Sequence, residues 1–389
     1  MHVKTRTATT RPVYLGFFIY AFALGTLFPR LGDIQLQLGI EEGTLGLSIS
    51  GLAIGLQLSL LAADRVVSIV STRLVMLVGI PMISGFFWLA ALTTTPFGFF
   101  FCLFLAGLSV GVIEVAINLE ADRTEYILGA RIMNRSHGFW SLGFFGTSIA
   151  GAVMAQIGVS PALHYFIFGL LCSVGCAVFF WSFEQAPIRP GAKEASPLFI
   201  KPTKPILILV LLTLSAMLVE GSSIDWSVIY MRDTFQTVPL VSGMALALVA
   251  FSQFVTRYFA DAVIDQHGPE RISRISIILM FIGVSLVAFS PVAAPALFGF
   301  TLMGIGCAVI FPLAMSAAAQ QTDRPASVNV ASLAQISFFT FLLAPPLLGF
   351  VAEHVDIRAA FGLSLPLIII SWFSVHGLRK PDSGHETSK

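Results

Sequence analysis

The feature that most constrains this chain is a series of apolar stretches, each about 20 residues long, that recurs along its whole length. One such stretch can cross the hydrocarbon core of a bilayer as a helix. Short segments with charges, Gly and Pro separate the stretches. We therefore predict twelve transmembrane helices, at about 12–31, 45–63, 74–93, 97–119, 137–157, 161–183, 205–230, 240–262, 272–290, 295–320, 328–352 and 358–378.

Composition narrows the class of protein further. The chain is 56% hydrophobic and only 11% charged, whereas about 25% of the residues of a typical soluble domain are charged. So few charges exclude a soluble enzyme and a disordered chain, and a net charge of +1 offers no basic surface to a nucleic acid. The four cysteines lie in apolar runs, so we expect no metal site. The sequence predicts an all-α polytopic protein of the lipid bilayer, which we expect to be a monomer.

The basic residues predict the orientation of the helices. If the N-terminus is cytoplasmic, 19 of the 22 Lys and Arg residues fall on the cytoplasmic side, and only Arg30, Arg232 and Arg358 fall outside. Positive charge is enriched in cytoplasmic loops. A missed or extra helix would destroy this alternation. The count therefore favours twelve helices with both termini in the cytoplasm.

A polar, proline-rich segment near the midpoint divides the chain. We predict a six-helix bundle at 1–183, a cytoplasmic linker at 184–204, a second bundle at 205–380 and a tail at 381–389. Two features repeat at an interval of 197 residues: Asp64 with Asp261, and Gly107 with Gly304. Two pseudo-symmetric six-helix halves repeated in parallel are the plan of the major facilitator superfamily.

The segment after the second predicted helix resembles a loop of that superfamily, G-x-x-x-D-R-x-G-R-[RK]. Asp64, Arg65 and Arg73 match it, and the second half keeps Asp261 and Arg271. The resemblance implies that these charges latch the cytoplasmic helix ends together in the outward-facing state. We expect Arg257 to join this cluster through Asp261.

Other stretches look like one bacterial branch of the superfamily, the YbjJ/MosC type. They are Pro29-Arg30, Glu114-Val115-Ala116-Ile117-Asn118, His137-Gly138-Phe139-Trp140-Ser141-Leu142-Gly143, and Glu220-Gly221 followed by Asp225-Trp226-Ser227. One named member of that branch is associated with rhizopine, a methylated aminocyclitol. The resemblance implies a multi-pass transporter of the bacterial inner membrane.

Two acidic residues inside apolar runs are the main functional candidates, because ionisable groups are costly in a bilayer. Glu114 has Asn118 one turn away on the same face. Glu220 precedes Gly221, where we expect the helix to be broken, as in many transporters. Either carboxylate can bind solute or carry a proton, or be a buried acid held by a neighbouring helix. Asp225 is expected to carry a proton, or to cap or pair near the outer surface.

Uncharged polar groups complete the predicted binding set. Trp140 can stack on a sugar-like ring or sit at the membrane interface. Gln57, Gln253 and Gln335 can bind hydroxyl groups or hydrogen-bond between helices. At the end of the first helix, Arg30 and Asp33 are spaced to pair, as an outer salt bridge or as a gate.

These residues favour a secondary transporter of a small polar solute, such as a sugar, a polyol or an aminocyclitol like a rhizopine. The chain has no phosphate-binding loop, so we expect no cofactor and a proton gradient as the energy source. The leading alternative is a proton-coupled exporter of drugs or metabolites. Motifs of membrane enzymes are absent, and a non-transporting sensor is a further alternative.

Overall fold

The computed structural model describes residues 9–187 and 200–379. The predicted tail 381–389 and most of the predicted linker 184–204 lie outside these residues, as does the side chain of Asp64. The described residues form α-helices and two short 3-10 helices: α1 (Arg11–Gly25), η1 (Phe28–Arg30), α2 (Leu31–Leu38), α3 (Glu42–Ile69), α4 (Thr72–Leu92), α5 (Pro96–Leu128), α6 (Met133–Gln156), α7 (Pro161–Phe180), α8 (Lys204–Phe235), α9 (Pro239–His267), α10 (Pro269–Phe289), α11 (Ala293–Cys307), α12 (Ile310–Ala319), α13 (Ala326–His354), α14 (Ile357–Gly362), α15 (Ser364–Ser374) and η2 (Val375–Leu378).

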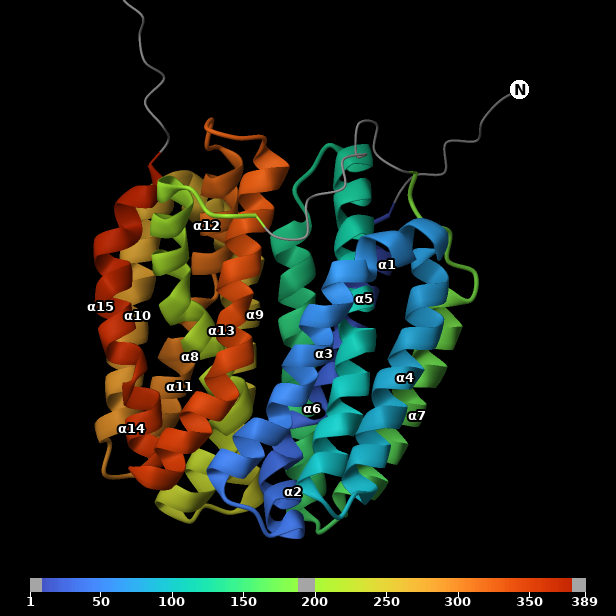
Figure 1. Cartoon of the computed structure of the whole chain (residues 1–389), viewed down its shortest axis with the longest axis vertical. Helices are drawn as coiled ribbons and strands as arrows, with labels where there is room; N and C mark the ends of the chain where they lie inside the picture. Colours follow the sequence, from blue (N-terminus) through green and yellow to red (C-terminus); the bar gives the residue numbers. More distant parts are fainter. Residues whose placement is uncertain (1–8, 188–199, 380–389) are drawn as a thin grey trace, which may run out of the picture.

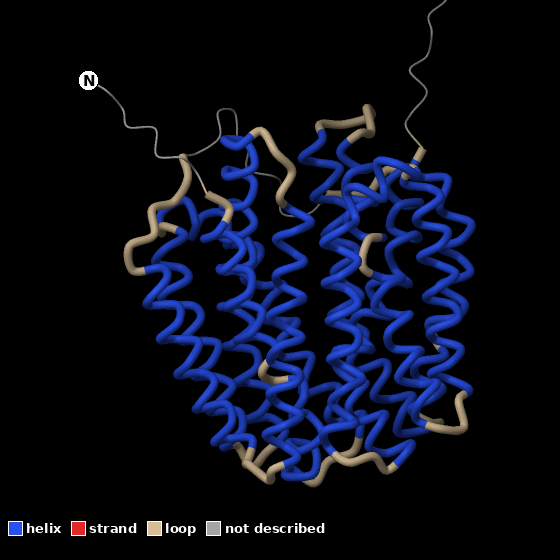
Figure 2. Tube along the Cα trace, turned by 180° about the vertical axis from the view of Figure 1, so that it is seen from behind, coloured by secondary structure: helices blue, strands red, loops and turns tan. Residues whose placement is uncertain are grey.

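Twelve segments of the described chain are long and apolar enough to cross a membrane. Three of them join shorter elements: Arg11–Leu38 contains α1, η1 and α2, Ala293–Ala319 contains α11 and α12, and Ile357–Leu378 contains α14, α15 and η2. The helices run side by side with loops at both ends (Figure 2). The predicted all-α architecture with twelve spans is confirmed.

Local sequence sets many of the helix ends. The side-chain oxygens of Ser71, Thr95 and Ser160 accept backbone amides at the starts of α4, α5 and α7, which is the usual N-cap arrangement. Gly39 and Gly129, both with positive φ, end α2 and α5. Four helices nevertheless run at least five residues past the predicted ends, α3 to Ile69, α5 to Leu128, α8 to Phe235 and α9 to His267. There the polar ends of the helices continue beyond the apolar stretch.

The predicted break in the seventh span is wrong. Helix α8 is continuous through Gly221, and the hydroxyls of Ser222 and Ser223 donate to the Val219 carbonyl at 3.0 and 2.6 Å. Hydroxyls that bond back within a helix leave its ladder intact. The tenth span is interrupted instead, at 308–309 between α11 and α12. Short non-helical segments are visible within the bundle in Figure 2.

The helices form two halves, α1–α7 and α8–α15, that stand side by side (Figure 1). The glycines of the repeat occupy equivalent places in them. A Cβ at Gly107 on α5 would collide with the Leu52 carbonyl oxygen on α3, and a Cβ at Gly304 on α11 would lie 2.6 Å from the Val249 carbonyl oxygen on α9. Such close backbone contacts require small residues. The repeat read from the sequence therefore marks the same helix crossing in each half.

The two ends of the bundle differ in what they carry. The described chain begins and ends at one end, where α7 also ends and α8 begins (Figure 1); we call it the linker end. The opposite end, which includes the loops 39–41, 157–160, 236–238 and 355–356, is called the far end. Arg30, Arg232 and Arg358, the three basic residues expected outside, all belong to far-end segments.

The halves meet closely at the far end through α3 and α13. A Cβ at Gly46 would collide with the carbonyl oxygen of Pro345, and Glu353 Oε2 accepts the Gly43 amide at 2.8 Å. Arg232 adds a bond from Nη1 to the Gly32 carbonyl, 2.8 Å long. Toward the linker end α3 and α13 diverge (Figure 1). On this side of the bundle the halves are therefore closed at the far end and separated at the linker end.

Helices α6 and α9 keep the halves in contact on the other side. Near the far end, a Cβ at Gly243 would collide with Ala152 Cβ, and Gln156 Oε1 accepts the Leu240 amide at 3.1 Å. At the linker end, Asn134 on α6 donates to Asp261 on α9. The α6–α9 contact thus follows the length of the bundle and passes the level of the candidate site.

Candidate functional site

In the first half the candidate site is built around Glu114 on α5. The Asn118 amide donates to Glu114 Oε1 and to the Glu114 carbonyl, both at 2.9 Å. Tyr20 on α1, almost fully buried, hydrogen-bonds the same carboxylate. In the described parts of the chain, Glu114 forms no ion pair. Among the described residues its carboxyl group therefore has only neutral hydrogen-bond partners.

In the second half Glu220 on α8 has a charged partner. Glu220 Oε1 accepts from Arg257 Nη2 at 3.0 Å and from Gln253 Nε2 at 2.8 Å. The side chains of Glu220 and Arg257 keep exposed fractions of 13% and 11%. Two carboxylates that look alike in the sequence thus differ in charge environment: Glu220 is neutralised by a guanidinium and Glu114 is not.

The polar groups of both halves lie at one level of the bundle. With a rise of about 1.5 Å per residue, Tyr20, Glu114, Ser141, Glu220 and Arg257 each lie about 22–27 Å from the far end of their span. The hydrocarbon core of a bilayer is about 30 Å thick. The helix register therefore brings hydrogen-bonding groups from five spans to a common depth inside the membrane.

Aromatic rings on α1 and α6 lie near the level of these polar groups. The ring of Trp140 on α6 stacks on Phe144 with centroids 4.9 Å apart, and Tyr14 on α1 stacks on Phe139 at 4.7 Å. Trp140 is partly exposed. It lies on α6 one residue before Ser141, which places it at the same level of the bundle.

Asp225 differs from the other two acids. It lies on α8, about 15 Å from the far end, and is only 8% exposed. No hydrogen bond or ion pair joins it to any residue in 9–187 or 200–379. It therefore neither caps a helix nor pairs, in contrast to the expectation for an outer-surface acid. A buried carboxylate without a partner is costly unless a proton neutralises it.

The three predicted glutamines have different surroundings. Gln253 is part of the Glu220 cluster and also donates to Cys307 Sγ at 3.2 Å. Gln335 on α13 accepts the amide of Ile200 at 3.2 Å, next to the start of α8. Gln57 is partly exposed on α3. Of these glutamines, Gln253 is directly joined to a candidate carboxylate, that of Glu220.

Arg30 and Asp33 form the ion pair that their spacing predicts. Arg30 is buried at 2% exposure and also donates to the Val159 carbonyl at 2.7 Å. The neighbouring His164 is fully buried, and neither of its ring nitrogens has a hydrogen-bond partner among the described residues. The bond from Arg30 to Val159 connects the first span to the loop that precedes α7.

The predicted latch is arranged differently from the expectation. Arg257 pairs with Glu220 inside the bundle, while Asp261 accepts from Asn134 at 2.5 Å, and Asp265 pairs with Arg131 at 3.4 Å. The expected pairing of Arg257 with Asp261 is therefore wrong. Other latch candidates are Arg65 and Arg271, both exposed, and Arg73, which lies 5.8 Å from the Trp181 ring centroid.

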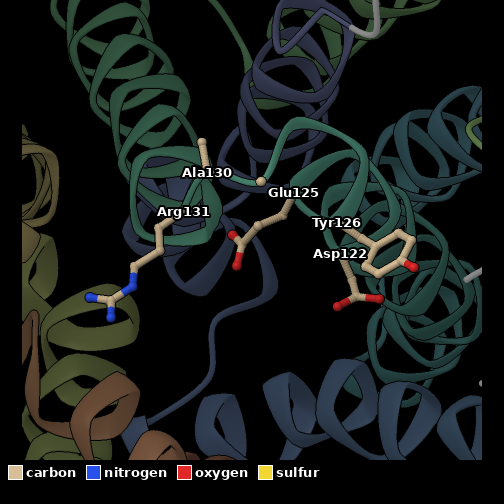
Figure 3. A pocket seen from close by; sticks show the side chains of 6 residues that line it. Asp122, Glu125, Tyr126, Ala130 and Arg131 are labelled. Carbon is tan, nitrogen blue, oxygen red and sulfur yellow. The ribbon is translucent and has the colours of Figure 1, made fainter.

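A cavity of about 300 Å³ opens at the linker end, where α5 ends and α6 begins. Its lining includes Asp122, Glu125, Tyr126 and Arg131 (Figure 3). Glu125 Oε2 accepts the amides of Ile132 and Met133 at 2.7 and 3.1 Å, so this acid caps the start of α6. The cavity is separate from the polar level, and none of the predicted binding residues line it.

Sequence reasoning missed two members of the site, Tyr20 and Ser141. Both stand in apolar stretches, where a single hydroxyl residue usually bonds within its own helix or to a neighbour. Tyr20 becomes important only because α1 brings it to Glu114, and Ser141 only because α9 brings Arg257 to it. To find these two residues one must know how the helices are aligned with each other, and no local sequence pattern gives that alignment.

Comparison with known proteins concerns the family and the fold of the chain. Residues 208–389 match the family model of the Major Facilitator Superfamily. An uncharacterized transporter of Sinorhizobium fredii, y4wD, is 28% identical over 367 residues, which cover 92% of this chain and 96% of the relative. Membrane protein MosC of Rhizobium meliloti is 23% identical over 355 residues, or 90% of this chain and 86% of MosC. The crystal structure of nucleoside transporter NupG has the same fold, with a TM-score of 0.73 at 12% identity, over 95% of this chain and 98% of NupG.

Proposed function

We propose that this chain moves a small polar solute across the bacterial inner membrane by alternating access. The match of residues 208–389 to the Major Facilitator Superfamily model, the relative named as a transporter and the fold shared with NupG support this proposal. The cargo class is a sugar, a polyol or an aminocyclitol such as a rhizopine. Transport is uptake coupled to protons. The relatives that are named transporters support this proposal, in which the protein is a membrane transporter and not an enzyme.

The observation that carries this proposal is the contrast between the two carboxylates at one depth. Glu114 has only neutral partners, Tyr20 and Asn118, whereas Glu220 is paired with Arg257. A carboxylate without a cationic partner can exchange a proton, or take up a cationic group, without first breaking an ion pair. Glu114 is therefore the proposed exchanging site.

The remaining groups at this level suit a small ring with hydroxyl groups. The amides of Asn118 and Gln253 can donate and accept hydrogen bonds, and the apolar face of a sugar-like ring can lie against the Trp140 indole. Glu114 and Glu220 belong to different halves, so one solute that contacts both would connect them. Binding between two repeated halves near the midplane is common among secondary transporters.

The experiment is solute-dependent thermal stabilisation of the purified protein. The panel contains inositols, aminocyclitols, polyols, sugars and lipophilic cations. A ligand of the native state stabilises it by about 2.7 kcal/mol when its concentration is 100 times Kd. The variants are Glu114→Gln at the site and Glu41→Gln as a matched control, since Glu41 is exposed in the far-end loop.

A polyol or aminocyclitol is expected to stabilise the wild type and Glu41→Gln but not Glu114→Gln. In proteoliposomes the same solute should then drive proton uptake in the wild type, and Glu114→Gln should lose that proton flux. Stabilisation by lipophilic cations alone would replace this proposal with the exporter. Binding without any solute flux would identify a sensor.

A further inference from the structure

Arg257 uses all three of its nitrogens, each toward a different membrane span. Nη2 donates to Glu220 Oε1 on α8 at 3.0 Å, and Nε donates to the carbonyl of Ala308 at 3.2 Å. Nη1 donates to Ser141 Oγ on α6 at 2.9 Å. A guanidinium holds such a fork rigidly, and charge-assisted hydrogen bonds are stronger than neutral ones. One side chain thus joins four helical segments from two halves.

The contact with Ala308 falls on the interruption of the tenth span. Helix α11 ends at Cys307 and α12 begins at Ile310. The residue four positions after Ala308 is Pro312, which has no N–H to donate to the Ala308 carbonyl. Arg257 supplies a donor in its place. The break, the ion pair with Glu220 and helix α9 are therefore held as one unit within the second half.

The contact with Ser141 crosses between the halves. The Ser141 hydroxyl is fully buried and donates its own proton to the His137 carbonyl at 3.1 Å. Its oxygen can therefore only accept from Arg257. At the level of the candidate site, this bond fixes α6 of the first half to α9 of the second.

We propose that Arg257 is a positioning residue that links the charge of Glu220 to the contact between the halves. While Glu220 is ionised, it holds Arg257 in the fork and thereby keeps the Ser141 bond. A solute donor that binds Glu220 competes with Arg257 for the same oxygen. Arg257 then leaves Ser141, and α6 and α9 can move relative to each other.

This inference rests on the proposed alternating access and deepens it. The ion pair acts against switching without cargo, because the bond to Ser141 is broken only when something else satisfies Glu220. A guanidinium left among neutral acceptors in the membrane would lose its counter-charge, which is costly. Neutralising Glu220 should therefore disfavour the arrangement seen here, in which α3 and α13 are in contact at the far end.

The test needs no solute. Single cysteines report each end in a background without the four native cysteines: Ile229→Cys, buried at the far end, and Ala331→Cys, partly exposed toward the linker end. A membrane-impermeant maleimide measures their labelling rates in nanodiscs. Two site variants are compared, Ser141→Ala and Glu220→Gln. The matched control is Ser148→Ala, whose buried hydroxyl bonds only to the Phe144 carbonyl of its own helix.

Each site variant is expected to raise the labelling rate at 229 by about tenfold, the equivalent of one charged hydrogen bond, and to lower the rate at 331. The double variant should add little to either single one, because both break the same link. Opposite changes at the two ends separate switching from loosening, which would raise both rates.

The proposal is overturned if Ser141→Ala labels like Ser148→Ala, if both ends label faster, or if the two variants add independently. These outcomes differ from a failure of the proposed function. If no polar solute stabilises the protein, the cargo class is wrong, but the labelling result still reports on the link. If the link is absent, the stabilisation panel is unaffected.

Discussion

Substituting Gly46 by Ala should shift the protein away from the state that is closed at the far end. Gly46 on α3 faces the backbone of α13, and an added Cβ would collide with the Pro345 carbonyl oxygen. It would also lie 3.0 Å from Pro345 C and 3.2 Å from Pro346 Cα. All three are backbone atoms, so no side-chain rotation relieves the contact. Moving α3 away from α13 does relieve it, and that movement opens the far end.

The size of the shift follows from the packing. Overpacking a close contact by one methyl group costs about 1–3 kcal/mol. If that cost falls only on the far-end-closed state, the equilibrium moves by about 5- to 150-fold toward the far-end-open state. The change is large compared with the error of a labelling rate, and its sign is fixed by the direction of the clash.

The assay is again the maleimide labelling rate of Ile229→Cys, which should rise with the population of the open state. The matched control is Gly85→Ala on α4, where an added Cβ meets no atom within 4 Å. Both substitutions raise helix propensity by the same amount, so only the clash distinguishes them. Equal labelling of the two folded variants would refute the idea that the α3–α13 contact belongs to one state of a cycle.

Two further predictions concern packing and capping. Glu125→Ala removes the acceptor for the Ile132 and Met133 amides. We therefore expect the free energy of unfolding to fall by about 1–2 kcal/mol, which is measured as a lower Tm in detergent. An unchanged Tm would contradict the capping role. Gly55→Leu places a side chain against the Phe104 carbonyl at the α3–α5 crossing. This variant should lose monodisperse elution in gel filtration. Elution and a Tm equal to those of the wild type would show that the two helices can move apart to accept the side chain.

Several features of the fold are readable from single stretches of sequence. The apolar stretches predict twelve spans, and the caps at Ser71, Thr95 and Ser160 define where three of them start. The repeated Gly107 and Gly304 predict equivalent crossings. These signals are local or periodic, and lipid imposes them, because a lipid-exposed segment can satisfy its backbone groups only by forming a helix.

The pairing of charges is not readable in the same way. Arg257 and Asp261 are four residues apart on one helix face, so the local rule favours their pairing. In the structure Arg257 pairs with Glu220, 37 positions away, and Asp261 accepts a hydrogen bond from Asn134 of the other half. A long side chain within the membrane is satisfied by whichever acceptor the neighbouring helix brings within reach. That choice depends on helix register and rotation.

The sequence by itself thus determined the number of spans, their order, the division into two halves and the few ionisable residues that enter the membrane. Tertiary structure alone decided that Glu114 has neutral partners, that Glu220 is bound by Arg257, and that this arginine reaches Ser141 in the other half. The physical reason is the different distance over which the two kinds of interaction act. Burial in lipid acts on each helix separately, whereas a hydrogen bond of about 3 Å requires two helices to be placed against each other.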